Sequence, residues 1–404
     1  MARIRVVIVL YRDDAIVGGS LRVGEAIANS LDAGRVDARV VFAYGDAGVM
    51  TARAKVPVHH IGARSSKDLP GWIRARNLLK KIKPHVIHFV DPVNWIALAT
   101  LGVGAKHLFH FHGRPITSLM SLFDRSLMRA RCQLSDAFVG ITKGATNAAI
   151  EAGFARTETA WTVYNGVDFE SFENLPAKAE ARHVLGLPKS AKLIGQVARL
   201  VSYNGGGELL DILPRLSEEW HAVFVGDGPY RKGLELTAAE RGLGDRVHFT
   251  GVLQDVRPAY AALDAVILLA RYQPFCLMLA EAMASNVPVF GLRGSGEYAE
   301  PEYPLINTHN SVFINRSHPD DFESIETVEV LAELASRIDD YGSNPERYSP
   351  MIEYARVWIA TRFSAKLQAE AMFRVYEHMR YPDRIRTPAL AELYQPAFGA
   401  AARQ

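Results

Sequence analysis

Two glycines mark the first place in this sequence where a ligand could meet the backbone. Gly18 and Gly19 follow a short apolar run, 5–10, and precede a stretch with helical periodicity. Paired glycines let the backbone approach a phosphate, and the N-terminus of a helix offers free N–H groups to it. The dinucleotide fingerprint G-x-G-x-x-G is absent, so a plain tight turn explains the pair equally well.

A histidine, His112, follows another apolar run, 107–111, and is followed by Gly113. At the carboxyl end of a strand an imidazole can hydrogen-bond a ligand hydroxyl or stabilise a developing charge. Gly113 leaves room for a ligand beside it. Taken alone, His110 and His112 are each better explained as structural histidines.

An arginine, Arg199, follows an apolar run in the second half of the chain, 193–197. A guanidinium at this position can bind a diphosphate through two parallel hydrogen bonds. Gly228 lies in the turn Gly226-Asp227-Gly228-Pro229, after the next run, 221–225. Such a turn again brings backbone close to a ligand.

The segment Phe275-Cys276-Leu277 leads into a helical stretch that carries Glu281. The start of a helix favours a phosphate, because the helix dipole places partial positive charge there. A carboxylate further along the helix can accept two hydrogen bonds from ribose hydroxyls. The types and spacing of these residues therefore suit a nucleotide.

Short apolar runs alternate with amphipathic helices throughout the first half of the chain. This alternation predicts parallel strands joined by helical crossovers, a doubly wound α/β sheet. The expected strands are 5–10, 38–43, 86–90, 107–111 and 137–141, and the expected helices are 19–31, 72–83 and 120–131.

The same rhythm restarts after a linker-like segment, 173–182. The expected strands are then 193–197, 221–225, 247–250, 265–269 and 287–291, with helices at 207–216, 260–263 and 277–285. Two consecutive Rossmann-like units predict two domains that face each other across a cleft, with ligands beyond the carboxyl ends of the strands.

We place the first domain at 1–172 and the second at 183–361. A terminal helical stretch, 350–379, has room to return to the first domain with a helix at about 362–380, and 381–404 is a loosely ordered tail.

Size and composition exclude several classes of protein. With 404 residues the chain exceeds one ordinary core, and its net charge of +2 does not favour nucleic acid as a partner. Two distant cysteines, Cys132 and Cys276, exclude a disulfide framework and a cysteine-based zinc site, and they suit a reducing cytoplasm. The sequence has no run of about 18 apolar residues that would predict a transmembrane helix. The run 5–10 is too short for a signal peptide.

Two of the expected helices, 72–83 and 120–131, combine basic with large apolar residues. Basic amphipathic helices can lie on an anionic membrane, which would place the protein at the inner face of the membrane. The more ordinary explanation is a helix that packs on the core and turns a basic face to solvent.

The order of the motifs, rather than any one of them, resembles the family 4 glycosyltransferases of the GT-B fold over residues 4–380. The matching segments are Gly18-Gly19, His112-Gly113, Asn165-Gly166-Val167-Asp168, Arg199-Leu200-Val201, Gly226-Asp227-Gly228-Pro229, Pro274-Phe275 and Glu281-Ala282-Met283-Ala284-Ser285.

The resemblance implies a retaining transferase whose second domain binds a nucleotide-diphosphate sugar and whose first domain binds the acceptor. It assigns the diphosphate to Arg199 and the ribose to Glu281, with backbone support from Phe275, Cys276 and Leu277. It also implies that His112 faces the donor sugar and that Gly19 lies against the diphosphate. It implies no cofactor, no metal and no side-chain base: the departing phosphate oxygen takes the proton of the acceptor. The absence of an Asp-x-Asp pair agrees with independence from a metal.

Three positions depart from the family pattern. Asn204 stands where R-L-x-x-x-K-G expects a lysine, Gln273 replaces the first glutamate of E-x7-E, and Cys276 replaces a glycine. Losing the lysine removes a full positive charge from the leaving-group site.

We therefore expect an active transferase that acts on a glycan, a lipid-linked acceptor or a small molecule. A weakened pseudo-transferase that binds a glycan or a partner protein is the alternative. A GT-B phosphorylase would need a lysine-bound pyridoxal phosphate, for which the sequence has no signature.

Overall fold

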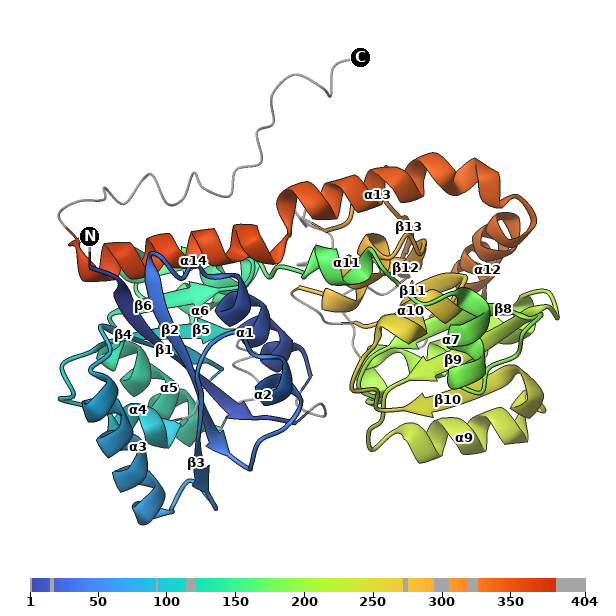
Figure 1. The fold of residues 1–404 in the computed structure, drawn as a ribbon. Coiled ribbons are helices and arrows are strands. Elements are labelled where there is room, and N and C mark those ends of the chain that lie inside the picture. The colour runs from blue at the N-terminus through green and yellow to red at the C-terminus, as the bar shows by residue number, and fades with distance from the viewer. Residues whose placement is uncertain are drawn as a thin grey trace. The chain divides into compact units, whose positions relative to one another are not determined.

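A computed structural model describes residues 2–14, 18–91, 94–113, 121–271, 275–293, 305–317 and 326–382. The chain divides into two compact units. Unit 1 comprises Met1–Gly166 together with Arg362–Gln404, and unit 2 comprises Val167–Thr361. Each unit is built around its own parallel sheet (Figure 1).

The sheet of unit 1 has seven strands in the order β3-β2-β1-β4-β5-β6-β7. Every neighbouring pair is parallel. The strands are β1 (Ile4–Arg12), β2 (Val36–Tyr44), β3 (Val58–Ala63), β4 (Val86–Val90), β5 (Lys106–Phe111), β6 (Ala137–Gly140) and β7 (Ala160–Thr162).

Successive residues of β1 point to opposite faces of this sheet, because the side chains of a strand alternate. Val7 and Val9 belong to a core cluster with residues of α3 and α4. On the other face, Leu10 lies against Gly24 of α1, where an added Cβ would come within 2.5 Å of the Leu10 side chain.

The helices of unit 1 are α1 (Gly19–Ser30), α2 (Val49–Arg53), α3 (Leu69–Ile82), α4 (Asn94–Ala99), α5 (Leu122–Leu134), α6 (Lys143–Glu151), the 3₁₀ turn η3 (Thr157–Thr159) and α14 (Ala365–Arg380).

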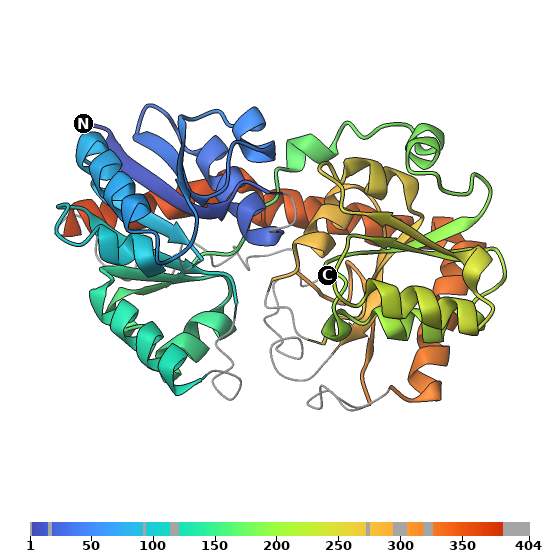
Figure 2. The ribbon, with the colours of Figure 1, turned by 90° about the horizontal axis from the view of Figure 1, so that it is seen from below.

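The last helix of the described residues, α14, lies beside α1 on unit 1, although more than three hundred residues separate the two in sequence (Figures 1 and 2). Gln368 Oε1 accepts a hydrogen bond from the backbone N–H of Gly166 (2.9 Å), and Glu370 forms an ion pair with Arg35 (2.7 Å). The expected terminal helix is broken at Ser364, whose hydroxyl caps α14 by accepting from Leu367 N.

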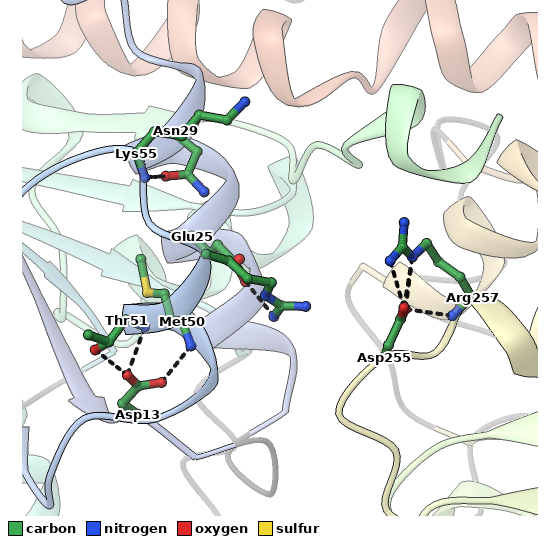
Figure 3. A network of polar contacts seen from close by, with 9 residues as sticks. Asp13, Glu25, Asn29, Met50, Thr51, Lys55, Asp255 and Arg257 are labelled. Carbon is green, nitrogen blue, oxygen red and sulfur yellow. Dashed lines mark hydrogen bonds and ion pairs between the residues drawn. The ribbon is translucent and has the colours of Figure 1, made fainter. Parts of the chain in front are cut away.

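The short helix α2 is held by a carboxylate at the end of β1. Asp13 accepts hydrogen bonds from the backbone N–H groups of Met50 and Thr51, at 2.8 and 2.9 Å, and from the hydroxyl of Thr51 (Figure 3). It also accepts one from the backbone N–H of Gly48, at 2.8 Å. These donors would otherwise be unsatisfied at the start of the helix. Asp13 therefore ties α2 to the carboxyl end of β1.

The sheet of unit 2 has six strands in the order β10-β9-β8-β11-β12-β13, again all parallel. The strands are β8 (Lys192–Val197), β9 (Trp220–Val225), β10 (Val247–Gly251), β11 (Ala265–Leu268), β12 (Val289–Arg293) and β13 (Val312–Asn315).

The helical segments of unit 2 among the described residues are η4 (Phe169–Phe172), α7 (Lys178–Val184), η5 (Ser202–Asn204), α8 (Gly206–Ile212), η6 (Leu213–Arg215), α9 (Arg231–Glu240), η7 (Gly244–Arg246), α10 (Arg257–Ala262), α11 (Leu277–Ala284), α12 (Val328–Ser343), η9 (Pro345–Tyr348) and α13 (Ser349–Arg362). Residues of α8, α9 and α12 belong to a core cluster of unit 2 that includes the fully buried Trp220, Phe224 and Phe290.

Two parallel sheets with flanking helices confirm the predicted fold class of two Rossmann-like domains. The division between the units lies at Gly166, whereas the first domain was expected to end at residue 172. The reason is the packing of Phe172, whose ring lies 5.8 Å from that of Tyr260 in unit 2. The segment 173–182 is not a plain linker either, since α7 begins within it and its last residue, Arg182, is buried.

Candidate functional site

Four of the predicted site residues lie after neighbouring strands of unit 2. Arg199 follows β8, Gly228 follows β9, and Glu281 lies in α11, which follows β11. Asn204 ends η5, between β8 and α8. Because β9, β8 and β11 are adjacent and parallel, their carboxyl ends meet at one edge of the sheet, where ligands of such sheets bind.

The segments after β8 and β9 are in close backbone contact. Leu200 N donates to Asp227 O and Tyr230 N donates to Leu200 O, both at 3.0 Å. A Cβ on Gly228 would lie 2.2 Å from Leu200 O, so only glycine fits there. The N–H of Gly228 donates to Oδ1 of Asp227 (2.6 Å). The absence of a side chain at Gly228 therefore allows the loop that carries Arg199 to lie against the turn after β9.

Asn204 is buried and its amide is directed at the loop itself. Its Nδ2 donates a hydrogen bond to the backbone carbonyl of Arg199 (2.7 Å). The backbone carbonyl of Asn204 accepts a hydrogen bond from Nε2 of Gln196. The amide thereby closes the turn between β8 and α8. Arg199, at the other end of this turn, is exposed to solvent.

Glu281 is 5% exposed and its Oε2 accepts a hydrogen bond of 2.7 Å from the hydroxyl of Tyr260. A buried carboxylate is costly unless it is hydrogen-bonded, and Tyr260, itself fully buried, supplies such a bond. The carboxylate is therefore held in one orientation before any ligand arrives. Tyr260 could not be identified from the sequence, because a residue 21 positions before Glu281 on another helix leaves no local pattern.

The N-terminus of α11 contains the other predicted donor-site residues. Cys276 occupies the N-cap position, Leu277 is the first helical residue, and the preceding Phe275 is buried. Burial raises the pKa of the Cys276 thiol to about 12, so the thiol is neutral at pH 7 and is not a nucleophile. Gln273 lies outside the described residues.

In unit 1, Gly18 is the N-cap of α1, with φ 81° and ψ −141°. No atom lies within 4 Å of an added Cβ, so glycine is favoured there by its backbone conformation and not by lack of space. Gly19 begins the helix, and both glycines are exposed.

His112 follows β5, at the same sheet edge as Gly18, and its backbone N–H donates to Oδ1 of Asp91 (3.2 Å). Its ring lies 4.3 Å from that of His110, whose Nδ1 is 3.2 Å from Nε2 of His88. The chain continues to the hydroxyl of Tyr376 in α14, 2.7 Å from Nδ1 of His88.

Burial keeps these three imidazoles neutral. It lowers the pKa of His88 to about 3 and the pKa of His110 well below its usual value, and it also lowers the pKa of His112 despite the nearby Asp91. A neutral His112 can donate from one ring nitrogen and accept at the other. His112 was predicted as a site residue from the sequence, whereas His88, Asp91 and Tyr376 were not.

Neither a metal-ligand cluster nor a membrane-spanning helix occurs in the part of the chain that the structure describes. No group of three or more histidine, cysteine, aspartate or glutamate side chains there could hold a metal ion. No helix in the described ranges is long and apolar enough to cross a bilayer.

Comparison with known families accounts for both units. Residues 17–171 match the family described as Glycosyltransferase Family 4, and residues 177–322 match Glycosyl transferases group 1. The chain belongs to the family 4 glycosyltransferases of the GT-B fold. The resemblance of the motif order is thereby confirmed, and the family is one of enzymes.

Relatives within this family act on different molecules. The lipopolysaccharide core biosynthesis glycosyltransferase LpsE of Rhizobium meliloti is 26% identical over 162 residues, which are 40% of this chain and 46% of LpsE. The 2-deoxystreptamine glucosyltransferase of Streptomyces kanamyceticus is 31% identical over 159 residues, which are 37% of this chain and 41% of that enzyme. The matched part thus spans less than half the length of either relative.

Solved structures extend the likeness to the whole fold. The crystal structure of Anabaena HepE in complex with UDP and glucose superimposes with a TM-score of 0.75 at 19% identity. The superposition covers 93% of this chain and 100% of HepE. At this identity the likeness shows a shared GT-B architecture.

Proposed function

We propose that this chain is a retaining, metal-independent glycosyltransferase that uses a nucleotide-diphosphate sugar as donor and needs no further cofactor. Unit 2 binds the donor, and unit 1 binds a glycan, a lipid-linked acceptor or a small molecule. The names of LpsE and the 2-deoxystreptamine glucosyltransferase support this range of acceptors, and the HepE complex makes UDP the first nucleotide to test.

The observation that carries the proposal is the pairing of Glu281 with Tyr260 at the sheet edge that also presents Arg199. A carboxylate oriented by a neighbouring hydroxyl can still accept hydrogen bonds from ribose hydroxyls, because its two oxygens offer several acceptor positions. An exposed guanidinium can bind a diphosphate with two parallel bonds. Together they would recognise both the ribose and the diphosphate of a nucleotide.

The chemistry that follows is mainly positioning. As the bond between sugar and phosphate breaks, negative charge accumulates on the diphosphate, and Arg199 would stabilise it. The departing phosphate oxygen would take the proton of the acceptor on the same face of the sugar, which retains the configuration. His112, neutral at pH 7, would hold a hydroxyl of the donor sugar.

Calorimetric titration with UDP, GDP and ADP, with and without EDTA, tests the donor site. We expect one of these nucleotides to bind equally well with EDTA. Replacing Glu281 or Arg199 by alanine should weaken that binding by about 1.5–3 kcal/mol, as is typical of hydrogen bonds to charged groups. Glu240→Ala, at the exposed end of α9, is the control. Binding that disappears with EDTA, or that both variants retain, would refute the proposed donor site.

A second candidate is a pseudo-transferase that binds a glycan or a partner protein. It is favoured by Asn204, whose amide donates to the Arg199 carbonyl and supplies no charge. Hydrolysis of UDP-, GDP- and ADP-sugars in the absence of acceptor separates the two. Slow release of free sugar supports the enzyme, whereas nucleotide binding without turnover on any donor or acceptor supports the binding protein.

We also propose that the protein works in the cytoplasm and contacts the inner face of an anionic membrane through unit 1. Leu69 and Ile73 of α3 are 66% and 61% exposed, and Lys80 continues the same face of the helix. Apolar side chains beside lysines suit an anionic bilayer surface. Co-sedimentation with vesicles containing phosphatidylglycerol should fall for Leu69→Ser/Ile73→Ser, and equal binding to pure phosphatidylcholine vesicles would count against the contact.

A further inference from the structure

A hollow lies on unit 2 at the edge of the sheet opposite to the proposed donor site. Its volume is about 560 Å³, and Val312, the first residue of β13, belongs to its lining. The donor-site residues follow the carboxyl ends of β8, β9 and β11, and the strands of this sheet are parallel. The hollow at the amino end of β13 is therefore separate from the donor site. Its volume falls within the range of about 300–1,000 Å³ that is typical of ligand pockets.

The wall of the hollow that comes from α13 presents an aromatic ring. Tyr354 is 41% exposed, and its ring stacks on that of Trp358, one helical turn further on, with 5.9 Å between centroids and 24° between planes. The ring of His309 lies 5.8 Å from that of Tyr354. These two neighbours support the tyrosine while part of its ring stays open to solvent. The face of an aromatic ring carries partial negative charge, so it attracts the polarised C–H groups on one face of a sugar ring.

The loop that contributes Thr308 and His309 to the lining is fixed by its own asparagines. Asn310, which is 1% exposed, donates to the carbonyl of Leu305 (2.8 Å) and accepts from the backbone N–H of Asn307 (2.9 Å). The side chain of Asn307 in turn accepts from the backbone N–H of His309 (2.8 Å). Because these bonds hold the loop without a ligand, binding costs less conformational entropy.

A further wall, from α12 and η9, carries two arginines whose charges are already balanced. Arg347 pairs with Asp340 (3.1 Å), and Arg337 approaches Glu333 (3.8 Å). The hydroxyl of Tyr348 donates to Asp340 (2.7 Å), and this bond is the main reason why the pKa of that carboxyl is lowered. Asp340 is therefore ionised at pH 7 and cancels the charge of Arg347. An anionic ligand would gain little attraction here, whereas the remaining guanidinium N–H groups can donate to hydroxyls.

We propose that this hollow binds a segment of an uncharged oligosaccharide, with Tyr354 stacked on one sugar ring and with Arg337 and Arg347 donating to its hydroxyls. Such a ligand combines apolar C–H faces with many hydroxyls, which is the combination that the lining offers. The inference goes beyond the proposed function, because the site lies away from the donor edge of the sheet and takes no part in the transfer. A site of this kind would hold a long glycan on the enzyme between transfers.

Titration of the full chain with five oligosaccharides, followed by saturation-transfer NMR, tests the site. The probes are maltopentaose, cellopentaose, mannopentaose, galactopentaose and chitopentaose. We expect at least one of them to bind, and Tyr354→Ala to weaken that binding about three- to tenfold, as the loss of an aromatic contact does. Tyr354→Phe keeps the ring and should retain the affinity of the wild type.

A second variant tests the polar wall. Arg337→Met keeps an unbranched side chain but removes the N–H donors, so it should weaken the same probe about two- to tenfold. Val357→Ala is the control, because Val357 lies on α13 and is 52% exposed, but it is not among the lining residues. It should leave the affinity unchanged. Thermal unfolding of each variant shows whether it is folded.

Salt distinguishes an uncharged ligand from an anion. Affinity for the bound pentasaccharide should stay the same between about 0.05 and 0.5 M sodium chloride, since screening acts only on charges. A heparin-derived pentasaccharide serves as the anionic probe. If it alone binds, and is released by salt, the hollow is an anion site and the proposal is overturned.

Two other outcomes would also overturn the proposal. One is a wild type that binds none of the five uncharged probes. The other is a folded Tyr354→Ala and a folded Arg337→Met that both bind as the wild type does, which would place the sugar elsewhere. Neither result touches the donor site, which depends on the nucleotide titrations alone. A wild type that binds a pentasaccharide but no nucleotide overturns the proposed function and supports the glycan site.

Discussion

The hydroxyl of Tyr376, in α14, lies 2.7 Å from Nδ1 of His88, a residue 288 positions earlier in β4. The phenol is neutral, because burial raises the pKa of Tyr376, and His88 is neutral because burial lowers its pKa to about 3. One proton therefore lies in each hydrogen bond of the chain Tyr376–His88–His110. The chain ties α14 to the strand that precedes His112 in the sheet.

The first prediction concerns acid stability of unit 1. The pKa of His88 is about 3 when folded and about 6.5 when unfolded, so the unfolded state binds more protons between these values. Stability is therefore fully present above pH 6.5 and falls as the pH drops, by ~1.4 kcal/mol per pH unit for each such histidine. Urea unfolding between pH 7 and pH 5 should show a smaller slope for His88→Leu than for wild type.

The control for this experiment is His309→Leu, since His309 is exposed and belongs to unit 2. It should leave the slope unchanged. An identical slope for wild type and His88→Leu would mean that His88 is not buried in its neutral form.

The second prediction compares two cations that share one carboxylate in unit 2. Arg182 and Lys178 bind Asp264 at 2.7 and 2.5 Å, but their side chains are 6% and 49% exposed. Arg182 also donates to the carbonyls of Lys189, Ala191 and Ala262. Arg182→Ala should reduce the free energy of unfolding by about 3–5 kcal/mol, because it leaves buried acceptors unpaired.

Lys178→Ala removes a bond of similar length to the same carboxylate, yet it should cost no more than about 1 kcal/mol, because its ammonium is exposed. Urea unfolding of both variants measures the difference. Equal losses would show that burial does not decide the strength of these pairs.

The regular part of this fold could be predicted from local patterns. The buried run Val86–Val90 is one of the strands in the structure with the bounds expected from the sequence. The strands β3, β7 and β13 were missed: β7 has only three residues, and β3 carries His59 and His60 inside a short run. Neither gives the apolar signal on which such a prediction depends.

The candidate site was only partly predictable, for a related reason. Arg199 and Glu281 could be identified because each follows a strand at a spacing that the family repeats. Tyr260 could not, because its hydrogen bond to Glu281 joins two helices at a separation that has no sequence period. The inward hydrogen bond of Asn204 likewise appears only once the loop is folded.

The third prediction compares two glycines that follow β9. An added Cβ at Gly228 would lie 2.2 Å from Leu200 O, whereas at Gly233, inside α9, the nearest atoms are at 3.6 Å. Gly228→Ala must push the loop of Arg199 away and should cost about 1–3 kcal/mol of stability and weaken nucleotide binding. Gly233→Ala should be neutral or stabilise by up to about 1 kcal/mol, because alanine favours a helix. Thermal unfolding and titration with the bound nucleotide measure both effects, and full affinity in Gly228→Ala would show that this contact does not position Arg199.

The fourth prediction concerns the carboxylate of Asp13, which accepts four hydrogen bonds from α2 and the residues just before it. Burial raises the pKa of Asp13, but these bonds outweigh it and lower the pKa below its usual 3.8. A lowered carboxyl pKa adds stability that is present above the pKa of the unfolded state and is lost as the pH falls through the pKa of the folded state.

Asp13→Asn keeps one acceptor oxygen without the charge, so it should lower the free energy of unfolding by about 1.5–3 kcal/mol at pH 7. The difference from wild type should shrink below pH 3.8, where the unfolded wild type begins to take up a proton while the folded carboxylate is still ionised. Asp46→Asn, an exposed carboxylate shortly before α2, should change stability little at either pH. A deficit in Asp13→Asn that stays constant between pH 7 and pH 3 would show that the amide loses the geometry of the cap and not its charge.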